Sequence, residues 1–104
     1  MDEKRSHARS PLSVPLSCRL PDGSVLAGTS RDISLGGMFI AADQRPGFNT
    51  KVTISIHLPG VAGESELPAI VRWTGEDGFG VQFGLLGART THAITELLRR
   101  RQRP

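Results

Sequence analysis

Apolar and polar residues alternate with a period of two along most of the chain, which is the pattern of half-buried β-strands. The clearest case is residues 52–58, where four aliphatic side chains alternate with Thr53, Ser55 and His57. Strands are predicted over residues 12–20, 24–34, 38–40, 52–58, 67–73 and 79–83. Pro15 falls on the polar face of the first of these segments, so that strand is expected to be an edge strand or an irregular one.

The period changes near the end of the chain, where apolar residues recur at intervals of three and four. This spacing predicts an amphipathic helix over residues 90–101, with Thr90 or Thr91 as its N-cap. Six short strands followed by one helix predict an all-β fold, a six-stranded antiparallel β-barrel with a C-terminal α-helix that closes or caps it. Residues 11–104 would form this barrel and helix, and residues 1–10, polar and charged, a flexible arm outside it.

Composition supports a small folded domain, because 38% of the 104 residues are hydrophobic and 22% are charged. The formal charge of +3 is concentrated at the two ends. Four arginines lie within residues 99–103, and residues 10–98 hold six cations against eight acids. The strand region is therefore slightly acidic, which argues against a barrel that binds nucleic acid along a basic groove. The terminal arginines are read as a solubilising helix end.

Several other classes of protein are also disfavoured. The longest apolar run, residues 38–42, is too short for a membrane span, and no signal peptide follows Met1, so we expect a cytoplasmic protein. Cys18 is the single cysteine, which excludes an internal disulfide. The three histidines share no ligand-like spacing, so neither a metal nor another cofactor is expected.

Two short motifs carry candidate chemistry. Arg5 and Arg9 lie four residues apart in a segment without an apolar pattern, and arginine suits both phosphate oxygens and the edge of guanine. The segment Asp-Ile-Ser-Leu-Gly-Gly at 32–37 is expected to send Asp32 and Ser34 to one face of a strand while Ile33 enters the core. A carboxylate can accept from guanine N1–H and N2–H, and Gly37 allows a close backbone approach or a positive φ.

The two motifs in this order resemble the PilZ domain family, whose members are bacterial receptors for the second messenger cyclic di-GMP. The segments at 70–73 and 78–83 resemble the last hairpin of that family, so the resemblance covers essentially the whole chain. It implies a stand-alone, non-enzymatic PilZ barrel that binds cyclic di-GMP and passes the signal to an unidentified protein partner when its N-terminal arm becomes ordered.

The resemblance also implies roles for individual residues. Arg5 and Arg9 would clamp the phosphates and bases, Asp32 would bind a guanine edge, and Ser34 would bind beside it. The neighbouring glycines, Gly36 and Gly37, would permit close packing. Further candidates for ligand contact are Lys4, His7 and Arg72. A long basic side chain at position 4 further implies that the ligand binds as an intercalated dimer.

Three alternatives remain open at this point. The chain could be a PilZ-like protein-interaction module with weak or no nucleotide binding, although both motifs are intact. A nucleic-acid-binding barrel is disfavoured by the acidic strand region, and a catalytic triad of His7, Asp32 and Ser34 by its geometry. Trp73 shares its strand face with Val71 and is interpreted as a core residue, as is Cys18.

Overall fold

Seven β-strands and one α-helix make up residues 9–101, the part of the chain that the computed structural model describes. The elements in chain order are β1 (Ser10–Pro11), β2 (Pro15–Arg19), β3 (Val25–Ile33), β4 (Gly37–Ala41), β5 (Lys51–Ile56), β6 (Ser65–Thr74), β7 (Gly78–Phe83) and α1 (Ala88–Arg101). Every predicted strand is present, because the period-two pattern gives each one an apolar face to bury.

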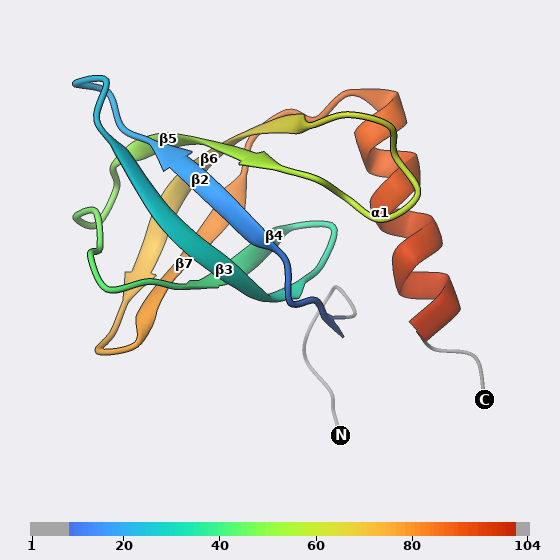
Figure 1. The fold of residues 1–104 in the computed structure, drawn as a ribbon, viewed down its shortest axis with the longest axis horizontal. Helices are drawn as coiled ribbons and strands as arrows, with labels where there is room; N and C mark the ends of the chain where they lie inside the picture. The colour runs from blue at the N-terminus through green and yellow to red at the C-terminus, as the bar shows by residue number, and fades with distance from the viewer. Residues whose placement is uncertain (1–8, 102–104) are drawn as a thin grey trace.

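Six of the strands close into an antiparallel barrel (Figure 1). Their order around it is β3, β2, β5, β6, β7 and β4, and β4 pairs back with β3. The predicted six-stranded barrel with a C-terminal helix is therefore confirmed. The additional strand β1 is two residues long and pairs with Asp32 and Ile33 of β3.

The first predicted strand is interrupted, because Leu12 to Val14 leave the regular ladder between β1 and β2. Ser30 fills the break with its side chain. Its buried hydroxyl donates to the carbonyl of Leu12 and accepts from the amide of Val14. The irregularity expected at Pro15 is thus confirmed, and one side chain replaces the missing backbone hydrogen bonds. As a result β1, and with it Arg9, is held against the end of β3.

The inward faces of the strands form one hydrophobic core. Residues with no measurable exposure come from five of the barrel strands and the helix: Ile33, Ile40, Ile54, Leu67, Val71, Phe79 and Ile94. The pattern in β5 is regular, with Val52, Ile54 and Ile56 buried and their polar neighbours partly exposed. This core fixes the orientation of the strands that carry the candidate site.

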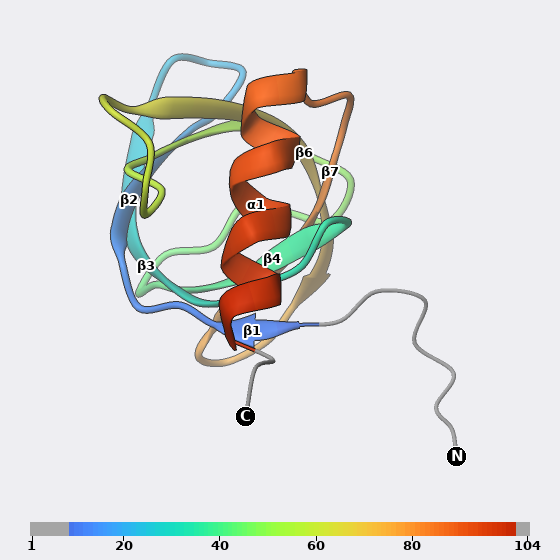
Figure 2. The same ribbon diagram turned by 90° about the vertical axis from the view of Figure 1, so that its right-hand side faces the viewer.

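The helix α1 lies across one end of the barrel and passes close to β1 (Figure 2). It begins two residues earlier than predicted, at Ala88, and the carbonyl of Gly87 accepts the first helical hydrogen bond from the amide of Thr91. The prediction of a threonine N-cap is therefore wrong. Ile94, Leu97 and Leu98 are buried against the barrel. Across residues 9–101, no helix is both long and apolar enough to traverse a bilayer.

Cys18 is buried in β2, as predicted, and desolvation raises the pKa of its thiol from 9.0 to about 11. The folded state therefore favours the protonated thiol, and this contribution to stability is present below pH 9 and lost as the pH rises toward 11. We expect the free energy of unfolding to fall by about 1 kcal/mol more in the wild type than in Cys18→Ala between pH 9 and pH 10. Urea titrations at both pH values measure this difference, and equal pH slopes for the two proteins would contradict it.

Candidate ligand-binding site

Arg9 and Asp32, one from each predicted motif, form an ion pair at the end of β3. The Nε and Nη2 atoms of Arg9 donate to Oδ1 of Asp32 at 3.1 and 2.6 Å. Both side chains are about one-third exposed, at 34% and 36%. An ion pair this open to water stabilises a protein by only about 0–1 kcal/mol. The fold therefore brings the two groups together, and breaking their ion pair to bind a ligand costs little free energy.

Asp32 and Ser34 both face Arg9 while Ile33 between them is fully buried in the core, as the alternation predicts. The strand β3 ends at Ile33, and Ser34 is buried, with only 1% of its surface exposed. Its Oγ accepts from the amides of Gly36 and Gly37, both at 3.2 Å, and from Nη1 of Arg9 at 3.4 Å. The hydroxyl therefore shapes the turn and helps to hold Arg9 over it.

The two glycines of the motif, Gly36 and Gly37, take part in backbone contacts between the strands of the barrel. Gly36 accepts a hydrogen bond from the amide of Phe83, and Gly37 pairs with Gln82 at the start of β4. A side chain at position 37 would overlap the carbonyl oxygen of Val81. Neither glycine has a positive φ, so close approach, and not a left-handed backbone, is the reason for Gly37.

Of these residues, Arg9, Ser34, Gly36 and Gly37 line an open cavity of about 560 Å³ on the outside of the barrel. This size falls within the range of small-molecule sites. The cavity is lined by Arg9, Ser34, Gly36, Gly37, Met38, Phe39, Arg72, Trp73, Gly80, Val81 and Gln82. Two arginines are among the described residues that line it; Arg9 is paired with Asp32, whereas Arg72 has only neutral partners, so the cavity is suited to an anion.

Arg72, an additional candidate from the sequence, also lines this cavity. Its Nε donates to the side-chain oxygen of Gln82 at 2.9 Å, and its Nη1 donates to that of Asn49 at 2.7 Å. Both partners are neutral amides, which fix the guanidinium without cancelling its charge. Arg72 is therefore oriented for an anionic group in the cavity.

Trp73 is 54% exposed, so its interpretation as a core residue is wrong. The register between β6 and β7 shifts between Val71 and Trp73, and this bulge turns the indole out of the barrel. There it packs beside Phe39, with 5.4 Å between the ring centroids. The signal that could have indicated an exposed ring is Gly75, two residues after Trp73, because a side chain there would overlap the indole.

Three candidate residues, Lys4, Arg5 and His7, lie outside the described residues. The candidate residues whose positions the structure defines are Arg9, Asp32, Ser34, Gly36, Gly37 and Arg72. Within residues 9–101 no cluster of His, Cys, Asp or Glu has the geometry of a metal site.

The sequence of this chain matches a known family model and a known protein. The family model of the PilZ domain matches residues 3–100. The cellulose synthase catalytic subunit (UDP-forming) of Xanthomonas axonopodis pv. citri is 38% identical over 79 residues, which are 76% of this chain but 11% of that protein. The chain therefore spans a small part of the length of this relative.

Solved structures share the same fold. The PilZ domain of CeSA from a cellulose-synthesizing bacterium is 23% identical with a TM-score of 0.69, covering 88% of this chain and 95% of that one. The PilZ domain of YcgR from Escherichia coli, solved with c-di-GMP, is 14% identical with a TM-score of 0.76, covering 96% and 92%. PilZ domains are regulatory binding modules. From the family match over nearly its whole length and from the shared barrel, this chain belongs to the PilZ domain family.

Proposed function

We propose that this chain binds cyclic di-GMP at the Arg9–Asp32 site and passes the signal to a protein partner through its N-terminal arm. The observation that carries the proposal is the meeting of Arg9 and Asp32 beside a cavity that Arg9 and Arg72 line. Such a site offers cations for two phosphates and a carboxylate for a guanine edge. Membership of a family that includes a c-di-GMP-bound structure supports the same ligand.

The chemistry of each group fits one part of the ligand. Asp32 can accept from N1–H and N2–H of guanine once Arg9 turns from it to a phosphate oxygen. The Arg9–Asp32 pair keeps both groups near their binding positions before the ligand arrives. Ser34, Gly36 and Gly37 then act by positioning, because their hydrogen bonds define the turn beside Asp32.

The arm supplies the remaining part of the proposal. Arg5, four residues before Arg9, would close on the ligand from the opposite side, with Lys4 favouring a stacked pair of ligands and His7 adding a donor. Arg9 directly precedes β1, which contacts α1. Ordering of the arm on the ligand would therefore change a surface that also includes the helix, and a partner could read this change.

Isothermal titration calorimetry with cyclic di-GMP and cyclic di-AMP tests the proposal. We expect binding of cyclic di-GMP in the micromolar range, at two ligands per protein chain, and binding of cyclic di-AMP that is at least about tenfold weaker. Adenine lacks the N1–H and N2–H donors, which would leave the Asp32 carboxylate unpaired, and about 1.4 kcal/mol corresponds to a factor of ten.

Each outcome of the titration has a separate meaning. Affinity for cyclic di-GMP weaker than about millimolar would contradict the receptor function and favour the protein-interaction module. One ligand per chain at saturation would dismiss the stacked pair alone. Equal affinity for the two dinucleotides would show that Asp32 does not read the guanine edge.

A further inference from the structure

A groove lies between α1 and the loop that joins β5 to β6. The loop runs beside the helix in both ribbon views (Figures 1 and 2), and the groove has a volume of about 380 Å³. One wall is residues 59–62 of the loop, and the other is a face of the helix formed by Arg89, His92, Ala93, Glu96 and Arg100. None of these residues lines the cavity beside Arg9, so the proposed ligand does not use the groove.

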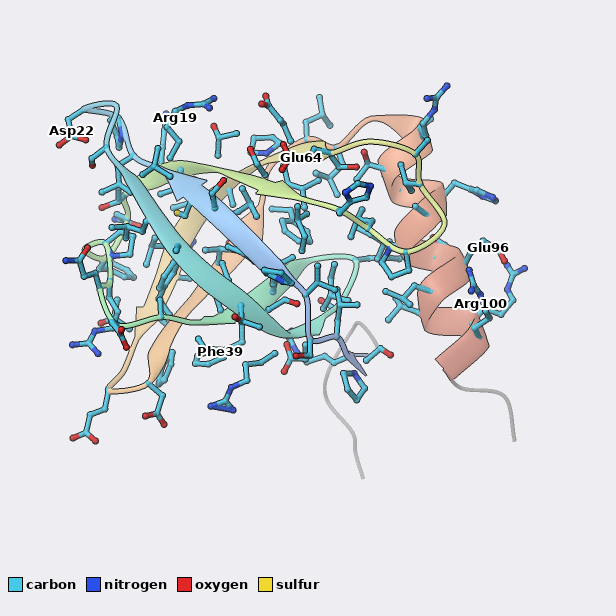
Figure 3. All side chains as sticks on the ribbon, viewed as in Figure 1. Arg19, Asp22, Phe39, Glu64, Glu96 and Arg100 are labelled. Carbon is cyan, nitrogen blue, oxygen red and sulfur yellow. The ribbon has the colours of Figure 1, made fainter. Side chains whose placement is uncertain are left out.

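The groove carries positive charge that the fold does not neutralise. Arg89 and Arg100 are exposed, and neither forms an ion pair with another residue in the part of the chain that the structure describes. Glu96 is the single carboxylate among the lining residues, and it already accepts from Nη1 of Arg99 at 3.1 Å. Glu96 and Arg100 both point away from the barrel (Figure 3). Two cations are thus left for a partner to compensate.

The floor of the groove is apolar. Val61 of the loop and Ala93 of the helix pack against the core but are only half-buried, so part of each stays in contact with water. Gly60, with a φ of 82°, allows the turn that brings the loop to the helix, and a Cβ atom there would lie 3.6 Å from Nη2 of Arg100. A partner that is only charged would leave this floor wet, and an apolar partner would leave the arginines unpaired. The groove therefore fits a segment that carries carboxylates and an apolar side chain together.

The spacing of the two arginines indicates the shape of that segment. Arg89 lies in the first turn of α1 and Arg100 in the last, so their backbones are separated by about 16 Å along the helix axis. An extended chain advances about 3.3 Å per residue, so carboxylates about five residues apart would match them. A phosphate ion is too short to reach both arginines, and a flat lipid surface would not reach the floor of the groove. An extended acidic peptide meets both conditions.

We propose that this groove docks an extended acidic peptide of a partner protein, with carboxylates on Arg89 and Arg100 and an apolar side chain over Val61 and Ala93. The inference goes beyond the proposed function, because it uses no residue of the cyclic di-GMP cavity and docking does not depend on that ligand. It also gives Arg100, one of the terminal arginines, a role other than solubility.

NMR titration of the isotope-labelled protein with a synthetic peptide tests the proposal. The probe is the capped octapeptide Gly-Asp-Ser-Leu-Val-Ser-Asp-Gly, whose two carboxylates are five residues apart. We expect saturable binding with a dissociation constant below about 1 mM, and shifts of the amide signals of Gly60, Val61 and Ala93 but not of Gly36 and Gly37. A peptide with asparagine in place of both aspartates, and one of unchanged composition with the aspartates adjacent, are each expected to bind at least about fivefold more weakly.

Charge reversal supplies a second test. Arg89→Glu/Arg100→Glu is expected to bind the acidic peptide at least about tenfold more weakly, and to bind a peptide with lysine in place of both aspartates, which the wild type rejects. Both arginines are exposed, so the variant should fold, and circular dichroism checks this. Arg19→Glu/Lys51→Glu is the matched control. It changes the net charge equally at exposed positions outside the groove and is expected to bind the acidic peptide like the wild type.

The outcomes separate this inference from the receptor function. The groove assignment would be overturned by the absence of saturable shifts at millimolar peptide, or by equal weakening in the control variant. Binding of the wild type to phosphatidylserine vesicles without binding of the peptide would also overturn it, in favour of a lipid surface. Calorimetry of Arg89→Glu/Arg100→Glu with cyclic di-GMP is expected to give the wild-type affinity. Peptide binding without any binding of cyclic di-GMP would refute the receptor function alone, and the reverse result would refute the docking groove alone.

Discussion

Replacement of Arg9 by alanine is expected to weaken cyclic di-GMP binding by about 100-fold or more. Arg9 is the cation that lies both at the cavity and within 2.6 Å of Asp32. Each hydrogen bond between a charged group and its partner contributes about 1.5–3 kcal/mol, and the variant loses at least one such bond to phosphate. It also leaves the charge of Asp32 uncompensated next to an anionic ligand. Calorimetric titration of the two proteins under one salt concentration measures the effect.

Folding of this variant should be almost unchanged, because Arg9 is partly exposed and its ion pair stabilises the barrel by only about 0–1 kcal/mol. Arg19→Ala is the matched control. Arg19 is an exposed arginine next to the β2–β3 turn, at the side of the barrel away from Phe39 (Figure 3). The Arg19→Ala variant is expected to bind cyclic di-GMP like the wild type. Arg9→Lys keeps the charge but not the planar fork of the guanidinium, and its affinity should lie between those of the wild type and Arg9→Ala. Wild-type affinity in Arg9→Ala would refute the site assignment even if the chain binds the ligand.

The sequence predicted the barrel well because its strands are amphipathic. In β5 every apolar residue is buried and every polar residue is at least partly exposed, so sequence and structure agree residue by residue. The pairing of Arg9 with Asp32 was also foreseeable in part. Each motif is local, and the resemblance to a family implied that the two would meet, although 23 positions separate them.

The errors occur where the backbone departs from a regular strand. A rule of alternation assumes an uninterrupted ladder, and the register shift between Val71 and Trp73 breaks it, so that Trp73 is exposed where strict alternation would bury it. Ser34 faces Arg9 as predicted, but it follows the last residue of β3, and its burial comes from the turn that its hydroxyl shapes. Bulges and turn geometry depend on contacts with neighbouring strands, which a single sequence does not display. The exposed indole and the buried hydroxyl could therefore not be predicted from period alone.

Replacement of Gly37 by alanine is expected to lower the free energy of unfolding by about 3 kcal/mol, at the upper end of the usual cost of over-packing. The added methyl group would overlap the carbonyl oxygen of Val81, a backbone atom of β7 that cannot rotate away. Because β4 pairs with both β3 and β7, the strands must separate to make room, and the barrel loses part of its closure. Urea denaturation followed by circular dichroism measures the change.

A second glycine provides the comparison that decides what Gly37 does. Gly47→Ala is expected to change stability by less than about 0.5 kcal/mol, because its nearest neighbour would be the Thr50 hydroxyl at 3.7 Å. If Gly37→Ala were as stable as Gly47→Ala and yet failed to bind cyclic di-GMP, the glycine would be needed for approach of the ligand. A large loss of stability instead assigns Gly37 to barrel closure. On that result, a glycine of the binding motif serves the ligand indirectly, by keeping β4 close enough to β7 for the turn beside Asp32 to form.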